Sequence, residues 1–205
     1  MEMDIEIRKA GKIDFEDTEI ITREGFWDLY KPGCDEHLIL TKIREGNCYI
    51  PDLDLVILLN HRIIGHVICT KAKIIDQNGL EHEILCAGPF SIGKQFQNQG
   101  YGTKLFQHCI ERAKQLNYKG IVLFGAPEYY HRFGFRNSIE FGITTKDGMN
   151  FEPFMTMELS GGGLKEMKGS FYEDDIYTTD KDELAAFERR FPHKEKHILP
   201  TQLHI

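Results

Sequence analysis

Three aliphatic runs separated by two short turn signals lie between residues 53 and 87, and they constrain the fold more than any other feature. Both residues of an Asn-Gly pair tolerate positive φ, so this pair favours a tight hairpin between apolar segments. The predicted hairpins join residues 53–59 to 63–72 through Asn60-His61, and residues 73–75 to 80–87 through Asn78-Gly79. The sequence therefore predicts a meander of three antiparallel strands.

A Gly-Pro pair interrupts the third strand of this meander. Proline cannot donate a backbone hydrogen bond to a sheet, and glycine adopts dihedral angles that other residues avoid. We therefore expect a bulge at Gly88-Pro89, after which the strand resumes at Phe90-Ser91-Ile92.

The segments on either side of the meander predict helices and further strands. In residues 100–116, Leu105, Cys109 and Ala113 recur every four residues, which places them on one face of a helix. The other expected strands are 4–9, 120–124, 139–144 and 154–159, the last two linked around Asp147-Gly148, and the other expected helices are 13–30, 35–44 and 127–133. This order predicts an α+β fold with a mixed, mostly antiparallel central sheet flanked by helices.

Three consecutive glycines at 161–163 mark a boundary. A chain of 205 residues favours one domain with a short addition, so we expect residues 1–163 to form the domain. Residues 164–205 then form a C-terminal extension. Within it, residues 180–191 predict a helix that begins at Asp180 and carries an apolar stripe, which favours an extension packed on the domain.

The charge balance argues against two classes of partner. Lys and Arg number 25 and Asp and Glu 32, giving a net charge of −7, whereas nucleic-acid binding relies on basic surfaces. A membrane-spanning helix needs about 20 apolar residues, and the longest aliphatic run here is only Leu55–Leu59. The acidic start, Met1–Asp4, lacks the apolar segment of a secretory signal. We therefore expect a cytoplasmic protein that binds neither nucleic acid nor membrane.

The cysteines and histidines predict no metal or disulfide framework. The number of cysteines, five, is odd, which argues against a full set of disulfides, and no two of them form a C-x-x-C pair. His193 and His197 have the i, i+4 spacing of a metal pair, but no third ligand lies near them in the sequence. We expect no metal, and a solvated tail around these histidines.

The segment from Phe90 to Thr103 predicts an anion site. A strand leads into a polar loop, and the loop opens the helix 100–116. First-turn N–H groups of a helix have no intrahelical acceptor, and the positive end of the helix dipole lies beside them. Gly100 and Gly102 lack the Cβ atoms that would hold a diphosphate away from these groups. The candidate cofactor-binding residues are Phe90, Ser91, Ile92, Gln97, Asn98, Gln99, Gly100, Tyr101, Gly102 and Thr103.

Other phosphate-binding motifs fit this segment poorly. It is not the G-x-x-x-x-G-K-[ST] loop of nucleotide triphosphatases. It has two of the three glycines of a dinucleotide fingerprint, and it follows a meander rather than the first strand of a βαβ unit. A nucleotide-dependent kinase or dehydrogenase is therefore disfavoured.

A second motif about thirty residues later gives the segment its context. The pattern Gln97-x-x-Gly100-x-Gly102, followed by Tyr130 four residues before Gly134-Phe135, resembles the GNAT superfamily of acyl-CoA N-acyltransferases. The sequence Pro127-x-Tyr-Tyr-x-Arg-Phe-Gly-Phe, with Gly88-Pro89 upstream, looks like the YhbS-like branch. The resemblance covers roughly residues 4 to 165.

The resemblance implies acetyl-CoA as co-substrate and a division of labour. The bulged strand would splay from strand 120–124 and leave a V-shaped slot, with residues 90–92 pairing with the pantetheine arm. Residues 97–103 would hold the pyrophosphate, and the Ile92 N–H would stabilise the oxyanion when an amine attacks the thioester directly. Tyr130 matches the general acid that protonates the departing thiolate, a role that suits a phenol with a pKa of about 10.

The general base is left open by the sequence. Some family members place a glutamate where this chain has Cys86, an improbable base. Glu83 is our candidate on the same strand, with Glu81 and bulk water as alternatives. Family topology places Phe26, Trp27, Tyr30 and His37 near the acceptor.

The function predicted is acetyl transfer to a primary amine of a small molecule or peptide. The alternative is a non-catalytic, acyl-CoA-binding regulatory module, which the missing carboxylate at position 86 favours. The sequence leaves the amine and the oligomeric state open.

Overall fold

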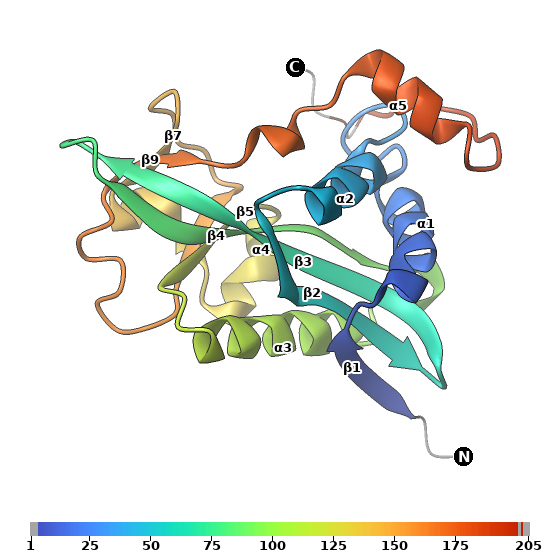
Figure 1. Ribbon diagram of the computed structural model, residues 1–205, viewed down its shortest axis with the longest axis horizontal. Coiled ribbons are helices and arrows are strands. Elements are labelled where there is room, and N and C mark those ends of the chain that lie inside the picture. The colour runs from blue at the N-terminus through green and yellow to red at the C-terminus, as the bar shows by residue number, and fades with distance from the viewer. Residues whose placement is uncertain (1–3, 201, 203–205) are drawn as a thin grey trace.

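A mixed sheet runs through the whole fold of the computed structural model, which describes residues 4–200 and 202 (Figure 1). The strand order is β1-β2-β3-β4-β5-β8-β6, and β9 pairs with β3 and β7. The pairs β4–β5 and β7–β9 are parallel and the others antiparallel. The strands are β1 (Ile5–Lys9), β2 (Tyr49–Leu59), β3 (Arg62–Asp76), β4 (Glu81–Ile92), β5 (Gly120–Phe124), β6 (Arg136–Asn137), β7 (Ile143–Thr145), β8 (Phe154–Glu158) and β9 (Gly169–Tyr172).

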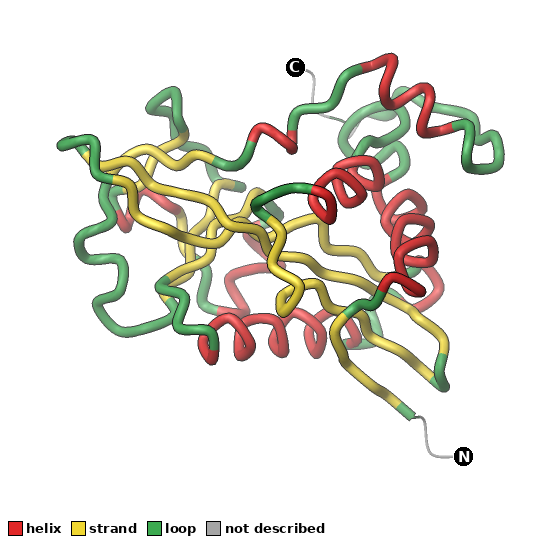
Figure 2. Tube along the Cα trace, in the orientation of Figure 1, coloured by secondary structure: helices red, strands yellow, loops and turns green. Residues whose placement is uncertain are grey.

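Helices lie on both sides of this sheet. Figure 2 shows α3 along one side, and α1 and α2 lie on the other. The α-helices are α1 (Phe15–Phe26), α2 (Glu36–Glu45), α3 (Tyr101–Gln115), α4 (Pro127–Tyr130) and α5 (Lys181–Glu188). Short 3-10 helices occupy Lys12–Asp14, Lys94–Phe96, His131–Phe133, Ser138–Phe141 and Asp175–Tyr177. The predicted α+β class is confirmed.

Strand β3 is buried on both faces, which explains its continuous apolar sequence. Val67 and Cys69 belong to the core that contains Leu105 of α3, whereas Ile68 between them packs with Leu40 of α2. Successive residues of a strand point to opposite faces of the sheet. β3 therefore contributes to two cores, one under each helical layer.

Both predicted hairpins are present. Asn60 and His61 have φ angles of 49° and 65°, and Gly79 has a φ of 80°. The β3–β4 register shifts between Val67 and Cys69, opposite Gly88-Pro89, where the peptide bond is cis. The predicted bulge is therefore confirmed.

Strand β4 leaves its parallel neighbour at this bulge. The described β4–β5 ladder consists of the pairs Leu85–Ile121 and Cys86–Val122. Beyond Cys86, β4 continues alongside β3 to Ile92, while β5 stays paired with β8. The two parallel strands therefore open as a V, as the resemblance implies.

Helix α1 is shorter than its apolar pattern predicts. It ends at Phe26 rather than at Tyr30. Asp28 has a φ of 60°, and its carboxylate accepts a hydrogen bond from the Gly33 N–H (2.7 Å). This side-chain contact stabilises a loop in place of another helical turn, so residues 27–30 join the connection to α2.

The prediction of one strand over residues 139–144 is wrong. Residues Ser138–Phe141 form a 3-10 helix, Gly142 then adopts a φ of 75°, and β7 begins at Ile143. The left-handed glycine ends the helical turn before the strand can start. β7 pairs with β9, not with β8.

Residues after Gly163 pack against the sheet and against α1. β9 pairs with β3, and the Asp180 carboxylate caps α5 by accepting hydrogen bonds from the N–H groups of Asp182 and Glu183 (2.8 and 3.1 Å). The Arg23 guanidinium pairs with Glu188 at 2.8 Å and so joins α1 to the end of α5.

The tail around His197 is exposed, as expected, but it is also anchored. Trp27 donates its indole N–H to the Glu195 carbonyl (2.8 Å). His197 contacts the Asp28 carboxylate (2.9 Å), and the Gln202 side chain donates to the Asp28 carbonyl (3.0 Å). Glu195, His197 and Gln202 therefore hold the connection between α1 and α2 in place.

A charged network lies buried under α2. The Asp54 carboxylate accepts hydrogen bonds from Arg44 Nε (2.9 Å) and Tyr49 (3.0 Å) and contacts His66 Nε2 (2.7 Å). Asp54 and His66 are fully buried. Burial raises the pKa of Asp54, but its hydrogen bonds with His66 and Arg44 and the charge of Arg44 outweigh burial and hold this pKa at about 2.

The five cysteines are free thiols and all are buried. Over residues 4–200 and 202, no helix combines the length and hydropathy needed to cross a membrane. In the same residues, no group of three or more His, Cys, Asp or Glu side chains is arranged to hold a metal ion.

Candidate active site

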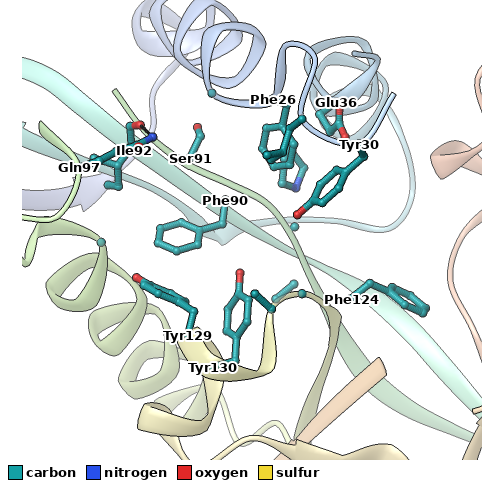
Figure 3. Close-up of a pocket in the computed structure, with 18 of the residues that line it drawn as sticks. Phe26, Tyr30, Glu36, Phe90, Ser91, Ile92, Gln97, Phe124, Tyr129 and Tyr130 are labelled. Carbon is teal, nitrogen blue, oxygen red and sulfur yellow. Dashed lines mark hydrogen bonds between the residues drawn. The ribbon is translucent and has the colours of Figure 1, made fainter. Parts of the chain in front are cut away.

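A cavity of about 760 Å³ lies where β4 and β5 separate (Figure 3). One wall comes from α1, α2 and their connection, and the opposite wall from the start of α3 and from α4. The second half of β4 runs between the two walls. Of the twelve predicted site residues, the lining includes Tyr130, Phe90, Ser91, Ile92, Gln97, Asn98, Gly100, Gly102 and Thr103.

Strand β4 presents both side chains and backbone to the cavity. The Ser91 hydroxyl lies 3.3 Å from that of Thr22 in α1, whereas the Phe90 ring packs toward Phe106 of α3. The Gly93 N–H donates to the β3 carbonyl just beyond the facing pair Gly65–Ile92. Because bonded and non-bonded pairs alternate along an antiparallel ladder, Ile92 directs its N–H away from β3, toward the slot.

The start of α3 has the features of an anion site. Gly100 is the N-cap with a φ of 85°, and no side chain caps the helix there. A Cβ at Gly102 would lie 2.8 Å from the Tyr129 hydroxyl, so glycine is required for this close approach. The Gln97 side chain donates to the Ile92 carbonyl (3.0 Å) and thereby ties the loop to the end of β4.

Three predicted site residues lie outside the lining. The Tyr101 ring is buried and packs against Phe96, and Gln99 donates its amide to the Gln95 carbonyl. Glu83 is exposed near the other end of β4 and faces Lys73 across the ladder. A base role for Glu83 would require an amine held outside the cavity.

Tyr130 directs its hydroxyl into the middle of the cavity (Figure 3). Its ring makes edge contacts with Phe106 and Phe135, at centroid distances of 5.4 and 5.8 Å. Burial raises the pKa of Tyr130, so the hydroxyl keeps its proton at neutral pH. The neighbouring Tyr129 points instead toward the start of α3.

Gly125 allows the Tyr130 ring to lie against the backbone. A Cβ at this glycine would overlap Cε2 of Tyr130. We expect Gly125→Ala to displace the hydroxyl and lower kcat about tenfold or more, since a displacement of about 1 Å can cost about 100-fold. The KM for acetyl-CoA should stay within about twofold, as steady-state kinetics will show.

Gly161→Ala is the matched control, because a Cβ at Gly161 would meet nothing within 4 Å. Equal losses of kcat in the two variants would contradict a positioning role for Gly125.

The wall opposite Tyr130 contains two of the four predicted acceptor residues. Phe26 and Tyr30 line the cavity. Trp27 faces the tail, as described above, and His37 is enclosed by α5, with its ring 5.4 Å from that of Phe187. Both placements follow from the early end of α1 and from the packing of α5, which apolar periodicity did not predict.

Sequence reasoning missed two carboxylates in the cavity, Glu36 and Glu173. Glu36 is the first residue of α2, and burial followed by the charge of Asp35 raises its pKa to about 7. Burial also raises the pKa of Glu173, which follows β9. A glutamate at a predicted helix start was a visible signal for Glu36, whereas the position of Glu173 depends on the pairing of β9 with β3.

The fold and the cavity agree with the comparisons with known proteins. The model of the acetyltransferase (GNAT) family matches residues 19–135, more than half of the chain, so the chain belongs to this family. The protein is accordingly an acetyltransferase. No curated protein matches the chain.

Solved structures of other acetyltransferases share the fold. The GNAT family N-acetyltransferase YhbS from Escherichia coli, in complex with CoA, is 18% identical with a TM-score of 0.76, over 86% of this chain and 93% of YhbS. A GNAT family acetyltransferase from Brucella melitensis, in complex with acetyl-CoA, is 21% identical with a TM-score of 0.69, over 85% of this chain and 99% of that one. The ribosomal-protein-S18-alanine N-acetyltransferase from Escherichia coli is 15% identical with a TM-score of 0.54, over 77% and 95%. The predicted membership of the GNAT superfamily is confirmed, and the chain shares its fold with YhbS.

Proposed function

We propose that this protein transfers an acetyl group from acetyl-CoA to a primary amine by direct attack. One observation carries the proposal: the uncapped start of α3, the splayed edge of β4 and the Tyr130 hydroxyl all face one cavity. This arrangement supports an anion site and a proton donor at two positions along one slot.

The residues at the start of α3 fit a diphosphate. A Cβ at Gly100 would meet no atom within 4 Å, so space is open above this end of the helix. The Arg132 side chain lies at the same end, 4.5 Å above the Tyr129 ring, and supplies positive charge. Acetyl-CoA supplies the activated acyl group, and the two relatives named above that were crystallised with CoA or acetyl-CoA support this choice.

Two groups of this chain would serve the acyl transfer. The Ile92 N–H, which faces the slot, can donate to the thioester oxygen as negative charge develops there. Tyr130 holds a proton at neutral pH and can give it to the departing sulfur.

Glu36 is the base that the cavity favours. Its pKa of about 7 lets it hold or release a proton near neutral pH, which is the range in which general bases are most effective. Burial, and after it the Glu36 charge, raises the pKa of Tyr30, whose hydroxyl points toward the centre of the cavity (Figure 3). Tyr30 therefore stands between Glu36 and the position of the amine.

Replacing Glu36 with Gln tests this assignment. Only the ionised carboxylate accepts a proton, so kcat/KM should rise with pH through about 7 in the unmodified protein. In Glu36→Gln we expect a loss of about 100-fold and no midpoint near pH 7. Glu173→Gln is the control, since it removes the other cavity carboxylate and should keep that midpoint. A retained midpoint in Glu36→Gln would assign it to another group.

The proposed function is tested by titrating the protein with CoA in a calorimeter and by following free thiol with acetyl-CoA and a library of amines. Saturable binding with thiol release from at least one amine is expected. Binding without release from any amine would support the regulatory module instead, and absence of binding would contradict both.

A further inference from the structure

We propose that the acceptor is an amine with an apolar body and no anionic group beside the amine. The inference rests on the proposed function, because it concerns the end of the same cavity that faces Tyr130 from α1 and α2.

Three exposed apolar side chains, from the α1–α2 connection and from the end of β5, line this end of the cavity. Leu29, Tyr30 and Phe124 line the cavity and are 45%, 43% and 44% exposed. Phe124 is fixed by stacking on Phe154 and Phe151, at centroid distances of 5.2 and 5.9 Å. A ligand that covers these side chains removes them from water at about 25 cal/mol per Å² of apolar surface, which favours an aromatic or aliphatic body.

The same end of the cavity has negative charge without a partner. Among residues 4–200 and 202, neither Glu36 nor Glu173 forms an ion pair, whereas the buried carboxylates of Asp54 and Glu188 are each paired with an arginine. Glu173 lines the cavity together with Cys86, which precedes the β4 bulge. Burial, and after it the Glu173 charge, raises the pKa of the Cys86 thiol. An ammonium group on the ligand would supply the missing positive charge.

The positive charge of the cavity lies at its other end. Arg132 is the one Lys or Arg in the described lining, and it sits over Tyr129 on the side of α3. The charges of Lys31 and Lys146 act on Glu36 and Glu173, but neither lysine lines the cavity. A carboxylate or phosphate on the acceptor would therefore face two glutamates and no lining cation. The walls thus favour an amine over an α-amino acid of the same shape.

Three amines that carry the same aromatic ring, and a fourth amine that lacks it, test this inference. Phenethylamine, phenylalanine amide and phenylalanine carry the same ring, and only phenylalanine adds a carboxylate; ethylamine lacks the ring. Calorimetric titrations at saturating CoA and pH 7 should show phenethylamine and phenylalanine amide binding at least tenfold more tightly than phenylalanine and ethylamine. Equal affinity for phenylalanine and its amide, or for ethylamine and phenethylamine, would overturn the inference.

Two variants assign the effect to the walls. Glu173→Gln should weaken phenethylamine and narrow the difference between phenylalanine and its amide. Phe124→Ala should weaken phenethylamine more than ethylamine. Glu152→Gln, an exposed residue outside the lining, is the control and should leave all four affinities unchanged. An unchanged preference in both cavity variants would count against these walls.

Free thiol measured with acetyl-CoA and the same four amines separates the proposed acetyl transfer from the proposed acceptor preference. Selective binding without thiol release would contradict acetyl transfer and leave the acceptor preference standing. Thiol release at equal rates from phenylalanine and its amide would support acetyl transfer and contradict the acceptor preference.

Discussion

Tyr130→Phe is expected to lower kcat by at least about 100-fold while leaving the affinity for acetyl-CoA nearly unchanged. General acid catalysis contributes about 100- to 10,000-fold, and the substitution removes the one proton that Tyr130 can deliver. The Phe ring keeps the contacts with Phe106 and Phe135, so the shape of the cavity is preserved. Steady-state kinetics together with a CoA titration measure both quantities.

The adjacent Tyr129 makes the experiment sharper. Burial raises the pKa of Tyr129 more than the hydrogen bond with Thr103 lowers this pKa, so Tyr129 also holds a proton. The Tyr129 hydroxyl, however, lies at the start of α3. Tyr129→Phe should affect CoA affinity more than kcat. Tyr118→Phe removes a hydroxyl outside the described lining and should change neither. An equal loss of kcat in the Tyr129 and Tyr130 variants would contradict the assignment.

Asp54→Ala is expected to destabilise the fold by about 3–5 kcal/mol, because it leaves Arg44 and His66 buried without their carboxylate. The free energy of unfolding of a domain is only about 5–15 kcal/mol, so this loss is a large share of its stability. Urea unfolding followed by circular dichroism measures it.

Asp52→Ala on the same strand is the control. Its carboxylate is part exposed and pairs with Lys9 and Arg112 at the surface, so the loss should be far smaller. Comparable losses in the two variants would contradict the importance of the buried network.

The network also makes stability fall in acid. The pKa of Asp54 is about 2, below the unfolded value of about 4, so its contribution is present above pH 4 and is lost toward pH 2. Burial lowers the pKa of His66, whose neutral form is retained in the fold; its contribution is therefore lost as the pH falls below about 6.5.

Local signals predicted most of the sheet. Turn pairs such as Asn78-Gly79 and the Gly88-Pro89 interruption act within a few residues, so the meander and its bulge could be read from the sequence. The early end of α1 could not, because it depends on Asp28 closing a loop with Gly33. The strand prediction for residues 139–144 failed for a similar reason, because β7 pairs with β9, a strand that follows it by more than twenty residues.

The candidate site likewise has one part that local sequence motifs predict and another part that depends on tertiary contacts. The half that contains Phe90, Gly100 and Tyr130 comes from motifs with fixed spacing, and the structure brings these residues to one cavity. Glu36 and Glu173 reach the cavity from α2 and from the segment after β9, so their presence in its lining depends on tertiary packing. Glu83, chosen for its strand, lies too far along β4 to line the cavity.

The anchoring of the α1–α2 connection has a consequence for the order in which the site can form. Trp27 and Asp28 are held by Glu195 and His197, which follow them by 168 and 169 positions. During synthesis on a ribosome, the half proposed to bind phosphate, which spans residues 90–132, emerges long before these anchors. The nascent chain can therefore complete the half that faces the nucleotide first, and it fixes the half that faces the amine only after residues 188–202 have been made.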